Sequence, residues 1–197
     1  TYANIKNKKY SYSRLFSRYK DANLPKHHII DLNENKLVKK NFFSLKTLEK
    51  VKEHLENGDQ VLFFINRRGF APYVLCKKCL NVFSCPNCSI NLVYHKNKKQ
   101  LLCHYCGYSS GIQRKCKKND LCDFIFSGPG VEKIAEDVKL LFPDKKVIIF
   151  SSDTMNKASG KNILTKIISG EVNILVGTQL ISKGFHFPNL NCIIVLD

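Results

Sequence analysis

The sequence has no apolar run close to the roughly 18 residues needed to cross a bilayer, and no charged leader followed by an apolar stretch. These absences argue against a membrane-spanning protein and predict a soluble chain in the cytoplasm. Acidic side chains are also few, since 16 Asp and Glu stand against 32 Lys and Arg, for a formal net charge of +16. This excess predicts a polyanionic partner such as nucleic acid. An AT-rich coding bias that inflates lysine is the alternative.

The remaining composition is that of a folded protein. Hydrophobic residues make up 44% of the 197 positions and aromatic residues 11%, enough to bury a core and to exclude a disordered chain. The length suits one domain that carries a small insert. The chain begins at Thr1 without a methionine and stops directly after the apolar run 193–196, so we expect it to be part of a longer protein.

Apolar segments with strand and helix character alternate on both sides of a cysteine-rich block. Helical spacing occupies residues 45–55, opened by Ser44 as an N-cap and closed by Asn57 and Gly58, and it recurs at 131–141 and 163–168. Strands are expected at 28–32, 61–65, 124–126, 147–150, 172–176 and 192–196. This alternation predicts an α/β fold with a largely parallel sheet covered by helices. We expect the domain to comprise 28–75 and 123–197, interrupted by an insert at 76–122, with 1–27 as an irregular N-terminal segment.

The insert holds eight of the nine cysteines, which are Cys76, Cys79, Cys85, Cys88, Cys103, Cys106, Cys116 and Cys122. Three C-x-x-C pairs are the signature of zinc knuckles, because a tight turn presents two thiolates to one tetrahedral ion. Disulfides are the competing interpretation, and the expected reducing compartment disfavours them. Complete four-thiolate sites are structural and need no further ligand. His95 and His104 are therefore expected beside the metal site or on the protein surface, and not as metal ligands.

The spacing between pairs favours a nested arrangement with two zinc ions. The 14 residues between Cys88 and Cys103 match the usual gap between knuckles, whereas the five between Cys79 and Cys85 are short for two knuckles on one ion. The first zinc is therefore assigned to Cys85, Cys88, Cys103 and Cys106, and the second to Cys76, Cys79, Cys116 and Cys122. The final pair is irregular, because Asn119 stands where C-x-x-C spacing would place sulfur.

Two stretches outside the insert have the composition of binding sites. Residues 66–70 (NRRGF) follow an expected buried strand, and residues 177–188 (GTQLISKGFHFP) follow another. Ligands of open α/β sheets bind at this carboxyl edge. Main-chain N–H groups, a hydroxyl and a lysine in the second stretch suit phosphate oxygens. A solvated turn is the alternative for the first stretch.

These stretches carry a family resemblance. The run 61–72, the C-x-x-C array, the segment 103–107, the turn 127–132 and the stretch 177–188 occur in the order seen in the PriA family of bacterial primosomal replication-restart helicases. The chain resembles this family from about His28 to Asp197. The resemblance implies most of the second RecA-like lobe of a superfamily 2 helicase that moves 3′ to 5′ on DNA, with a paired-zinc insert, and it supports the nested zinc pairing.

The resemblance also assigns residues and partners. It implies that Gly177, Thr178, Gln179, Lys183 and Gly184 lie at the interface between lobes and contact DNA, with Arg67 and Arg68 as further phosphate contacts. Implied partners are single-stranded and forked DNA, primosome proteins and single-strand-binding proteins, and the chain is expected to be a monomer. A G-x-x-x-x-G-K-[ST] loop and an Asp-Glu dipeptide are both missing. ATP and magnesium are therefore expected only with the first lobe, and the chain alone should not hydrolyse ATP.

Two rival hypotheses remain open from the sequence. The first is a stand-alone zinc-ribbon adaptor for protein or nucleic acid, which explains the cysteines but gives no role to residues 177–188. The second is a non-functional remnant of a helicase, consistent with the irregular last cysteine pair.

Overall fold

The computed structural model describes residues 1–14, 16, 24–38, 41–112, 123–155 and 160–196. These residues fall into two compact units, Thr1–Asp31 and Leu32–Asp197. The first unit contains the short helix α1 (Tyr2–Lys6), which buries none of its residues. Cys116 and Cys122, assigned to the second zinc from the sequence, lie outside the described residues.

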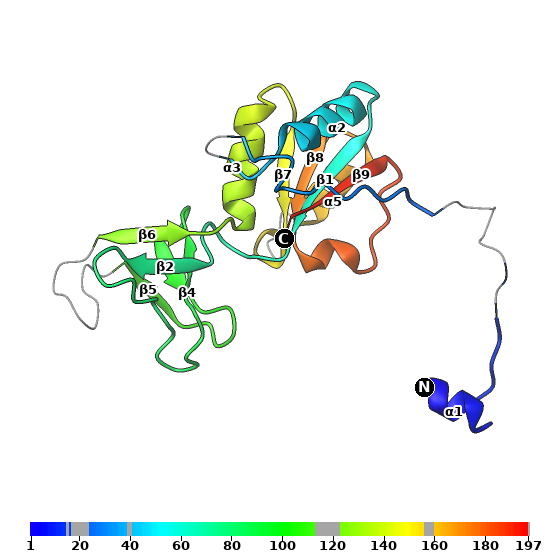
Figure 1. The fold of residues 1–197 in the computed structure, drawn as a ribbon, viewed down its shortest axis with the longest axis horizontal. Helices are drawn as coiled ribbons and strands as arrows, with labels where there is room; N and C mark the ends of the chain where they lie inside the picture. The colour runs from blue at the N-terminus through cyan, green and yellow to red at the C-terminus, as the bar shows by residue number, and fades with distance from the viewer. Residues whose placement is uncertain (15, 17–23, 39–40, 113–122, 156–159, 197) are drawn as a thin grey trace. The chain divides into compact units, whose positions relative to one another are not determined.

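A four-stranded parallel sheet forms the centre of the second unit (Figure 1). Its strand order is β7-β8-β1-β9, and β1 pairs in parallel with both β8 and β9. The strands are β1 (Gln60–Ile65), β7 (Val147–Phe150), β8 (Ile174–Gly177) and β9 (Leu190–Leu196). The predicted α/β fold is thus confirmed, with each of these strands overlapping an apolar run in the sequence.

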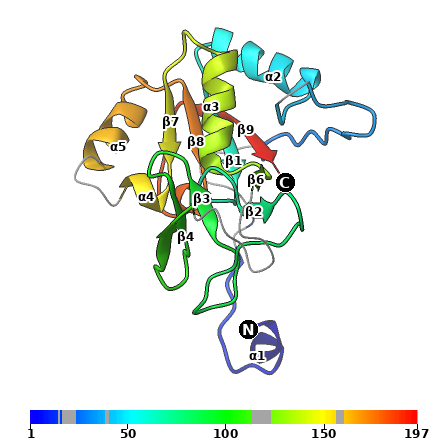
Figure 2. The ribbon, with the colours of Figure 1, turned by 90° about the vertical axis from the view of Figure 1, so that its left-hand side faces the viewer.

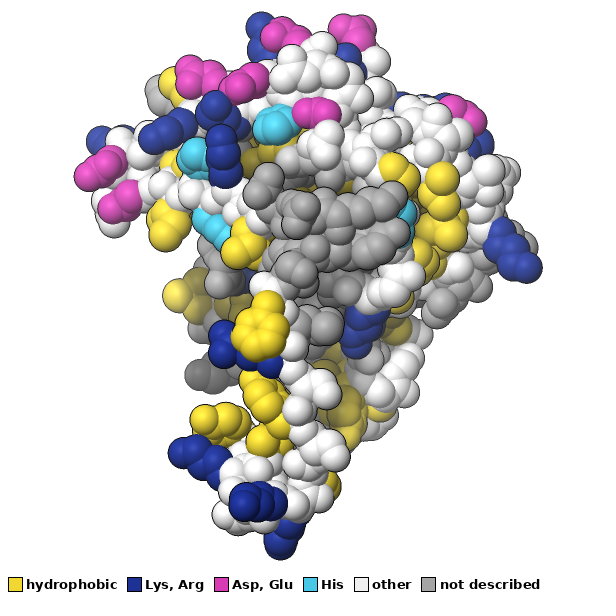
Figure 3. Space-filling model, turned by 90° about the vertical axis from the view of Figure 1, so that its right-hand side faces the viewer, with side chains coloured by type: hydrophobic (Ala, Val, Ile, Leu, Met, Phe, Trp, Pro, Cys, Tyr) yellow, Lys and Arg dark blue, Asp and Glu magenta, His cyan; other side chains and the backbone are white. Residues whose placement is uncertain are grey.

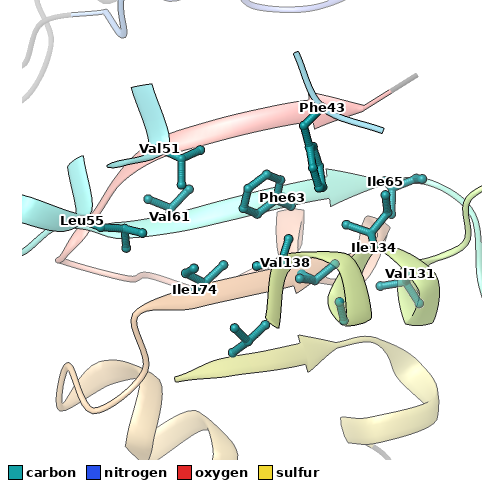
Figure 4. Packing of buried hydrophobic residues seen from close by; sticks show 13 residues of the cluster. Phe43, Val51, Leu55, Val61, Phe63, Ile65, Val131, Ile134, Val138 and Ile174 are labelled. Carbon is teal, nitrogen blue, oxygen red and sulfur yellow. The ribbon is translucent and has the colours of Figure 1, made fainter. Parts of the chain in front are cut away.

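Helices cover both faces of this sheet, as the unbroken apolar runs require. Helices α2 (Leu45–Glu56) and α3 (Val131–Leu141) pack on the side chains of Val61, Phe63 and Ile65 (Figure 4). Leu62 points to the opposite face, where α5 (Gly160–Ile168) contributes the buried Ile167. Successive residues of β1 therefore serve two separate hydrophobic layers.

Helix α2 begins and ends where the sequence predicts. The Ser44 hydroxyl accepts a hydrogen bond from the main-chain N–H of Thr47 at 3.2 Å, which satisfies one of the otherwise unpaired donors of the first turn. Asn57 is the C-cap. Gly58 follows with φ +83°, a left-handed conformation that glycine adopts without steric cost.

Two of the expected strands are not part of the parallel sheet. Residues 28–32 form no strand, and Ile29 is 95% exposed. An apolar segment becomes a strand only where a neighbouring strand supplies hydrogen bonds, so this expectation was wrong. Strand β6 (Phe124–Ser127) does form, but it pairs antiparallel with β2 (Tyr73–Cys76), outside the parallel sheet.

The cysteine-rich insert has a fold of its own between β2 and β6. It contains the antiparallel sheet β3-β4-β5, formed by β3 (Val93–His95), β4 (Gln100–Leu102) and β5 (Ser109–Gly111). A small hydrophobic cluster joins this sheet to the β2–β6 ribbon, and it includes Ala71, Val74, Leu92, Tyr94 and Leu101 together with Cys85 and Cys103. We call residues 76–112, as far as the structure describes them, the cysteine module.

Charge is spread over the surface. On the face shown in Figure 3, Lys and Arg side chains lie in separate groups, and Asp and Glu side chains accompany those at the top of the view. Among the described helices, none has the length and apolar character needed to cross a membrane.

Candidate metal and nucleic-acid sites

Three C-x-x-C turns share one main-chain geometry. In each, the N–H of the first cysteine donates to the carbonyl five residues later, and its own carbonyl accepts from the N–H four residues later. The residue directly after the second cysteine has a positive φ in every turn, 55° at Leu80, 54° at Ser89 and 79° at Gly107. The sequence spacing therefore builds three equivalent knuckles, which begin at Cys76, Cys85 and Cys103.

Two of these knuckles face each other. The sulfur atoms of Cys85, Cys88, Cys103 and Cys106 all lie within 4.8 Å of one another, and Sγ of Cys85 is 3.6 Å from Sγ of Cys106. A tetrahedral zinc with Zn–S bonds of about 2.3 Å places its sulfur ligands about 3.8 Å apart. The donor set and its spacing thus fit a zinc ion, and they join the cysteines that the sequence assigns to the first site.

The protonation chemistry of the cluster also suits a cation. A hydrogen bond from the main chain at Tyr108 lowers the pKa of the Cys106 thiol to about 6. The hydrogen bond between Cys88 and Cys106 raises the pKa of the Cys88 thiol to about 12, because it stabilises the protonated form of Cys88, and burial raises it further. A divalent ion binds the deprotonated thiolates, which is why such sites release protons when they bind metal.

The two stretches singled out in the sequence meet at one pocket of about 420 Å³. Arg67 and Arg68 reach it from the end of β1, and Thr178, Gln179 and Lys183 from the end of β8 and the short 3-10 helix η2 (Gln179–Ser182). Both strands end at the same carboxyl edge because they are parallel neighbours. Among the described residues that line the pocket, three are cationic (Arg67, Arg68 and Lys183) and none is acidic.

Gly177 and Gly184, predicted with this group, do not line the pocket. Gly177 is the last residue of β8, where a Cβ would lie 3.3 Å from side-chain atoms of Ile181 and Leu62. Gly184 has φ +72° and open space around it. Both glycines shape the main chain around Thr178, Gln179 and Lys183.

The turn that carries the two arginines is held by the start of α3. The N–H groups of Gly130, Val131 and Glu132 donate to the carbonyls of Phe70, Arg67 and Gly69 at 3.0, 2.9 and 2.9 Å. These donors belong to the end of the helix, where they have no partner within it. The role of Gly130 was not predicted, although the Ser-Gly-Pro-Gly sequence before the helix marks the turn.

Glu132 also fastens the cysteine module to the lobe. Its Oε1 lies 2.8 Å from Nδ1 of His95, and its Oε2 accepts from the main-chain N–H of Lys96 at 3.1 Å. The ammonium of Lys96 pairs with Glu136, one turn further along α3, at 2.7 Å. The module is thus anchored to α3 by two carboxylates.

His95 and His104 lie beside each other and are not members of the four-sulfur cluster, and their Nε2 atoms are 2.9 Å apart. Burial lowers the pKa of His104. The carboxylate of Asp153, in α4 (Ser152–Met155), joins the two imidazoles within 4.8 Å. Sequence reasoning considered each histidine separately and did not single out Asp153.

Comparisons with known proteins match two regions of the chain. Residues 98–197 match the helicase conserved C-terminal domain, and residues 85–110 match the PriA DNA helicase Cys-rich region domain. The second match and the four-sulfur cluster together indicate that the module binds zinc.

Several curated relatives are named replication restart protein PriA. The protein from Rickettsia typhi is 43% identical over 202 residues, which cover 100% of this chain and 31% of the relative. The Haemophilus influenzae protein is 37% identical over 98% of this chain and 26% of its own length. The Bacillus subtilis protein is 31% identical over 100% of this chain and 25% of its own length. The chain thus spans less than a third of these relatives. It belongs to the family defined by the helicase conserved C-terminal domain, and it is similar to replication restart protein PriA.

Proposed function

We propose that this chain forms the second RecA-like lobe, with its zinc insert, of an ATP-dependent helicase that moves 3′ to 5′ on DNA and restarts stalled replication. The observation that carries this proposal is the basic pocket at the carboxyl edge of the sheet, where both predicted stretches and His104 of the cysteine module meet. In this proposal residues 28–75 and 123–197 form the lobe, 76–122 the insert and 1–27 an irregular segment. The helicase-domain match over 98–197 argues against a stand-alone zinc-ribbon adaptor.

The pocket residues have distinct tasks in this proposal. Arg67, Arg68 and Lys183 are exposed cations that contact phosphates of a single strand. Thr178 and Gln179 hydrogen-bond to the same backbone. Phosphate contacts of this kind carry no base preference, as a motor that steps along any sequence requires.

ATP hydrolysis requires the first lobe in this proposal, because the phosphate-binding loop and the metal-binding acid are missing from this sequence. ATP and magnesium supply the chemical step when bound between the two lobes. The residues of this chain bind and orient DNA, and Thr178 and Gln179 lie where they can respond to the opposite lobe.

A second zinc belongs to the proposal. The knuckle at Cys76 has the same hydrogen bonds as the two knuckles of the first site. The N–H of the adjacent Lys77 donates to the carbonyl of Asp123 at 2.8 Å, and Asp123 is next in the chain after Cys122. The proposal takes Cys76, Cys79, Cys116 and Cys122 as the ligands of this second zinc, as the nested spacing in the sequence favours, with Cys116 and Cys122 outside the described residues.

The proposed partners follow from the chemistry of the pocket and from the family. They are single-stranded and forked DNA, primosome proteins and single-strand-binding proteins, met by a monomer in the cytoplasm. The names of the relatives, replication restart protein PriA, support this role.

Salt-dependent DNA binding tests the proposal. Three phosphate contacts on a single strand give a slope of about −2 in a plot of log affinity against log salt, so affinity should fall about 20-fold between 50 and 200 mM salt. The double variant R67A–K183A should flatten that slope by about 1.4, measured by fluorescence anisotropy with a labelled single strand. The control K52A–K139A removes equal charge from exposed positions on α2 and α3 and should keep the slope. Equal slopes for wild type and R67A–K183A would contradict the proposed DNA contacts.

A further inference from the structure

We propose that His95, His104 and Asp153 bind a divalent transition-metal ion where the cysteine module meets the helicase lobe, at a site separate from the cysteine cluster. One ligand atom from each residue lies within 4.8 Å of the other two. His95 ends β3 and His104 follows Cys103, whereas Asp153 belongs to α4 after the sheet strand β7. The labels α4 and β3 in Figure 2 mark the elements that carry Asp153 and His95, whose ligand atoms lie within 4.8 Å of each other.

Glu132 orients His95 for this role. Its Oε1 is 2.8 Å from Nδ1 of His95, so the proton sits on Nδ1 and the lone pair on Nε2 faces His104. The His95 side chain is only 5% exposed, and Glu132 is itself held by the main-chain N–H of Lys96. A carboxylate on the remote nitrogen is the usual support of a metal-binding histidine.

The spacing of the imidazoles fits an ion with open positions. With metal–nitrogen bonds of about 2.0–2.1 Å, two nitrogen atoms 2.9 Å apart subtend an angle of about 90° at the metal. That is the angle between adjacent ligands of an octahedron, and two histidines with one carboxylate commonly bind divalent transition metals while leaving positions for water. His104 also lines the basic pocket, so the proposed site borders that pocket.

A hydrogen bond between two neutral imidazoles is the alternative. Nε2–H of His104 would then donate to Nε2 of His95, an arrangement that does not use Asp153. The metal site accounts for all three residues, because the carboxylate supplies the negative charge that two neutral imidazoles lack. The ion would tie α4 of the lobe to the module, in addition to the contacts of Glu132 and Glu136 on α3.

The test is the metal content of the full chain, loaded with Zn²⁺ and then dialysed. Wild type should carry one ion per chain more than Asp153→Asn, whether the cysteines bind one zinc or two. The control Asp144→Asn changes another exposed acid of the lobe and should match wild type. Because Asp153→Asn keeps both imidazoles, it preserves the alternative hydrogen bond, and the thiolate charge-transfer absorption of a Co²⁺-loaded sample verifies that its cysteine cluster is intact.

Two affinity measurements complete the test. Glu132→Gln should weaken Zn²⁺ binding at this site by about 10- to 100-fold, the usual effect of removing a supporting carboxylate. Zn²⁺ added beyond the capacity of the cysteine sites should raise the melting temperature of wild type but not of Asp153→Asn. Equal metal content in wild type and Asp153→Asn, or equal melting shifts, would overturn the proposal regardless of whether the chain binds DNA.

Discussion

Replacing Gly130 with alanine should displace the turn that carries Arg67 and Arg68. Gly130 has φ −107° as the N-cap of α3, a conformation open to alanine, so the expected cost is steric. An added Cβ would lie 2.3 Å from the carbonyl oxygen of Gly69 and 2.9 Å from that of Arg68, whereas real Cβ contacts essentially never fall below 3.0 Å. Because both neighbours are main-chain atoms, no side chain can rotate away to relieve the overlap.

The magnitude follows from the hydrogen bonds at this position. The turn and the helix must separate by about 0.7 Å to bring the closest contact from 2.3 to 3.0 Å. Three hydrogen bonds of 2.9–3.0 Å join the same two segments and would stretch beyond normal hydrogen-bond length. At about 1 kcal/mol net for each bond, the loss is about 3 kcal/mol, or a fall in melting temperature of roughly 6–12 °C for a chain of this size.

Urea and thermal unfolding of Gly130→Ala against wild type measure this loss, and DNA anisotropy reports the displaced arginines. Gly111→Ala is a matched control, since nothing lies within 4 Å of its added Cβ, and its effect should stay within about 0.5 kcal/mol. If Gly130→Ala unfolds within 0.5 kcal/mol of wild type and binds DNA equally well, the inferred coupling between α3 and the arginine turn is wrong.

Two further predictions concern acid stability and metal removal. Hydrogen bonds from Asn191 and His54 lower the pKa of Asp59 below its ordinary 3.8, so the stability it adds is complete above that value and disappears as pH falls through the lower folded value. Asp59→Asn should therefore destabilise the chain at pH 7 and flatten its urea-measured stability profile below pH 4. Removal of metal by a chelator should unfold the cysteine module before the parallel sheet, so a protease should first cut within 76–112. Simultaneous cleavage of the sheet would show that the metal does not stabilise the module alone.

The parallel sheet could be predicted because its signals are local. The apolar run 61–65 needs helices on both faces, and the helical stripe of α2 with its Ser44 cap supplies one of them. Residues 28–32 have a similar apolar character but no strand beside them, which a local pattern cannot reveal. The pairing of β6 with β2, outside the main sheet, is likewise decided by where the insert begins and ends.

The candidate sites were predictable to different degrees. The spacing of the cysteines predicted the knuckles, because a turn of fixed length sets the positions of both thiols. The basic pocket could be predicted in part, because the two stretches that line it each follow a strand, and parallel strands end at the same edge of a sheet. The meeting of His95, His104 and Asp153 depends on how the module docks against α3, and residues 95 and 153 are too far apart in the chain for any periodicity to connect them.

The main-chain hydrogen bonds between α3 and the turn that carries Arg67 and Arg68 do not involve the charged side chains of that turn. The carbonyls that α3 holds belong to the peptide backbone, which every amino acid shares, so these hydrogen bonds do not depend on the side chains of Arg67 and Arg68. Arg67 and Arg68 can therefore be replaced in the laboratory while the hydrogen bonds that hold the turn to α3 are kept. Evolution can retune the ligand preference at this edge of the sheet without rebuilding the lobe that supports it.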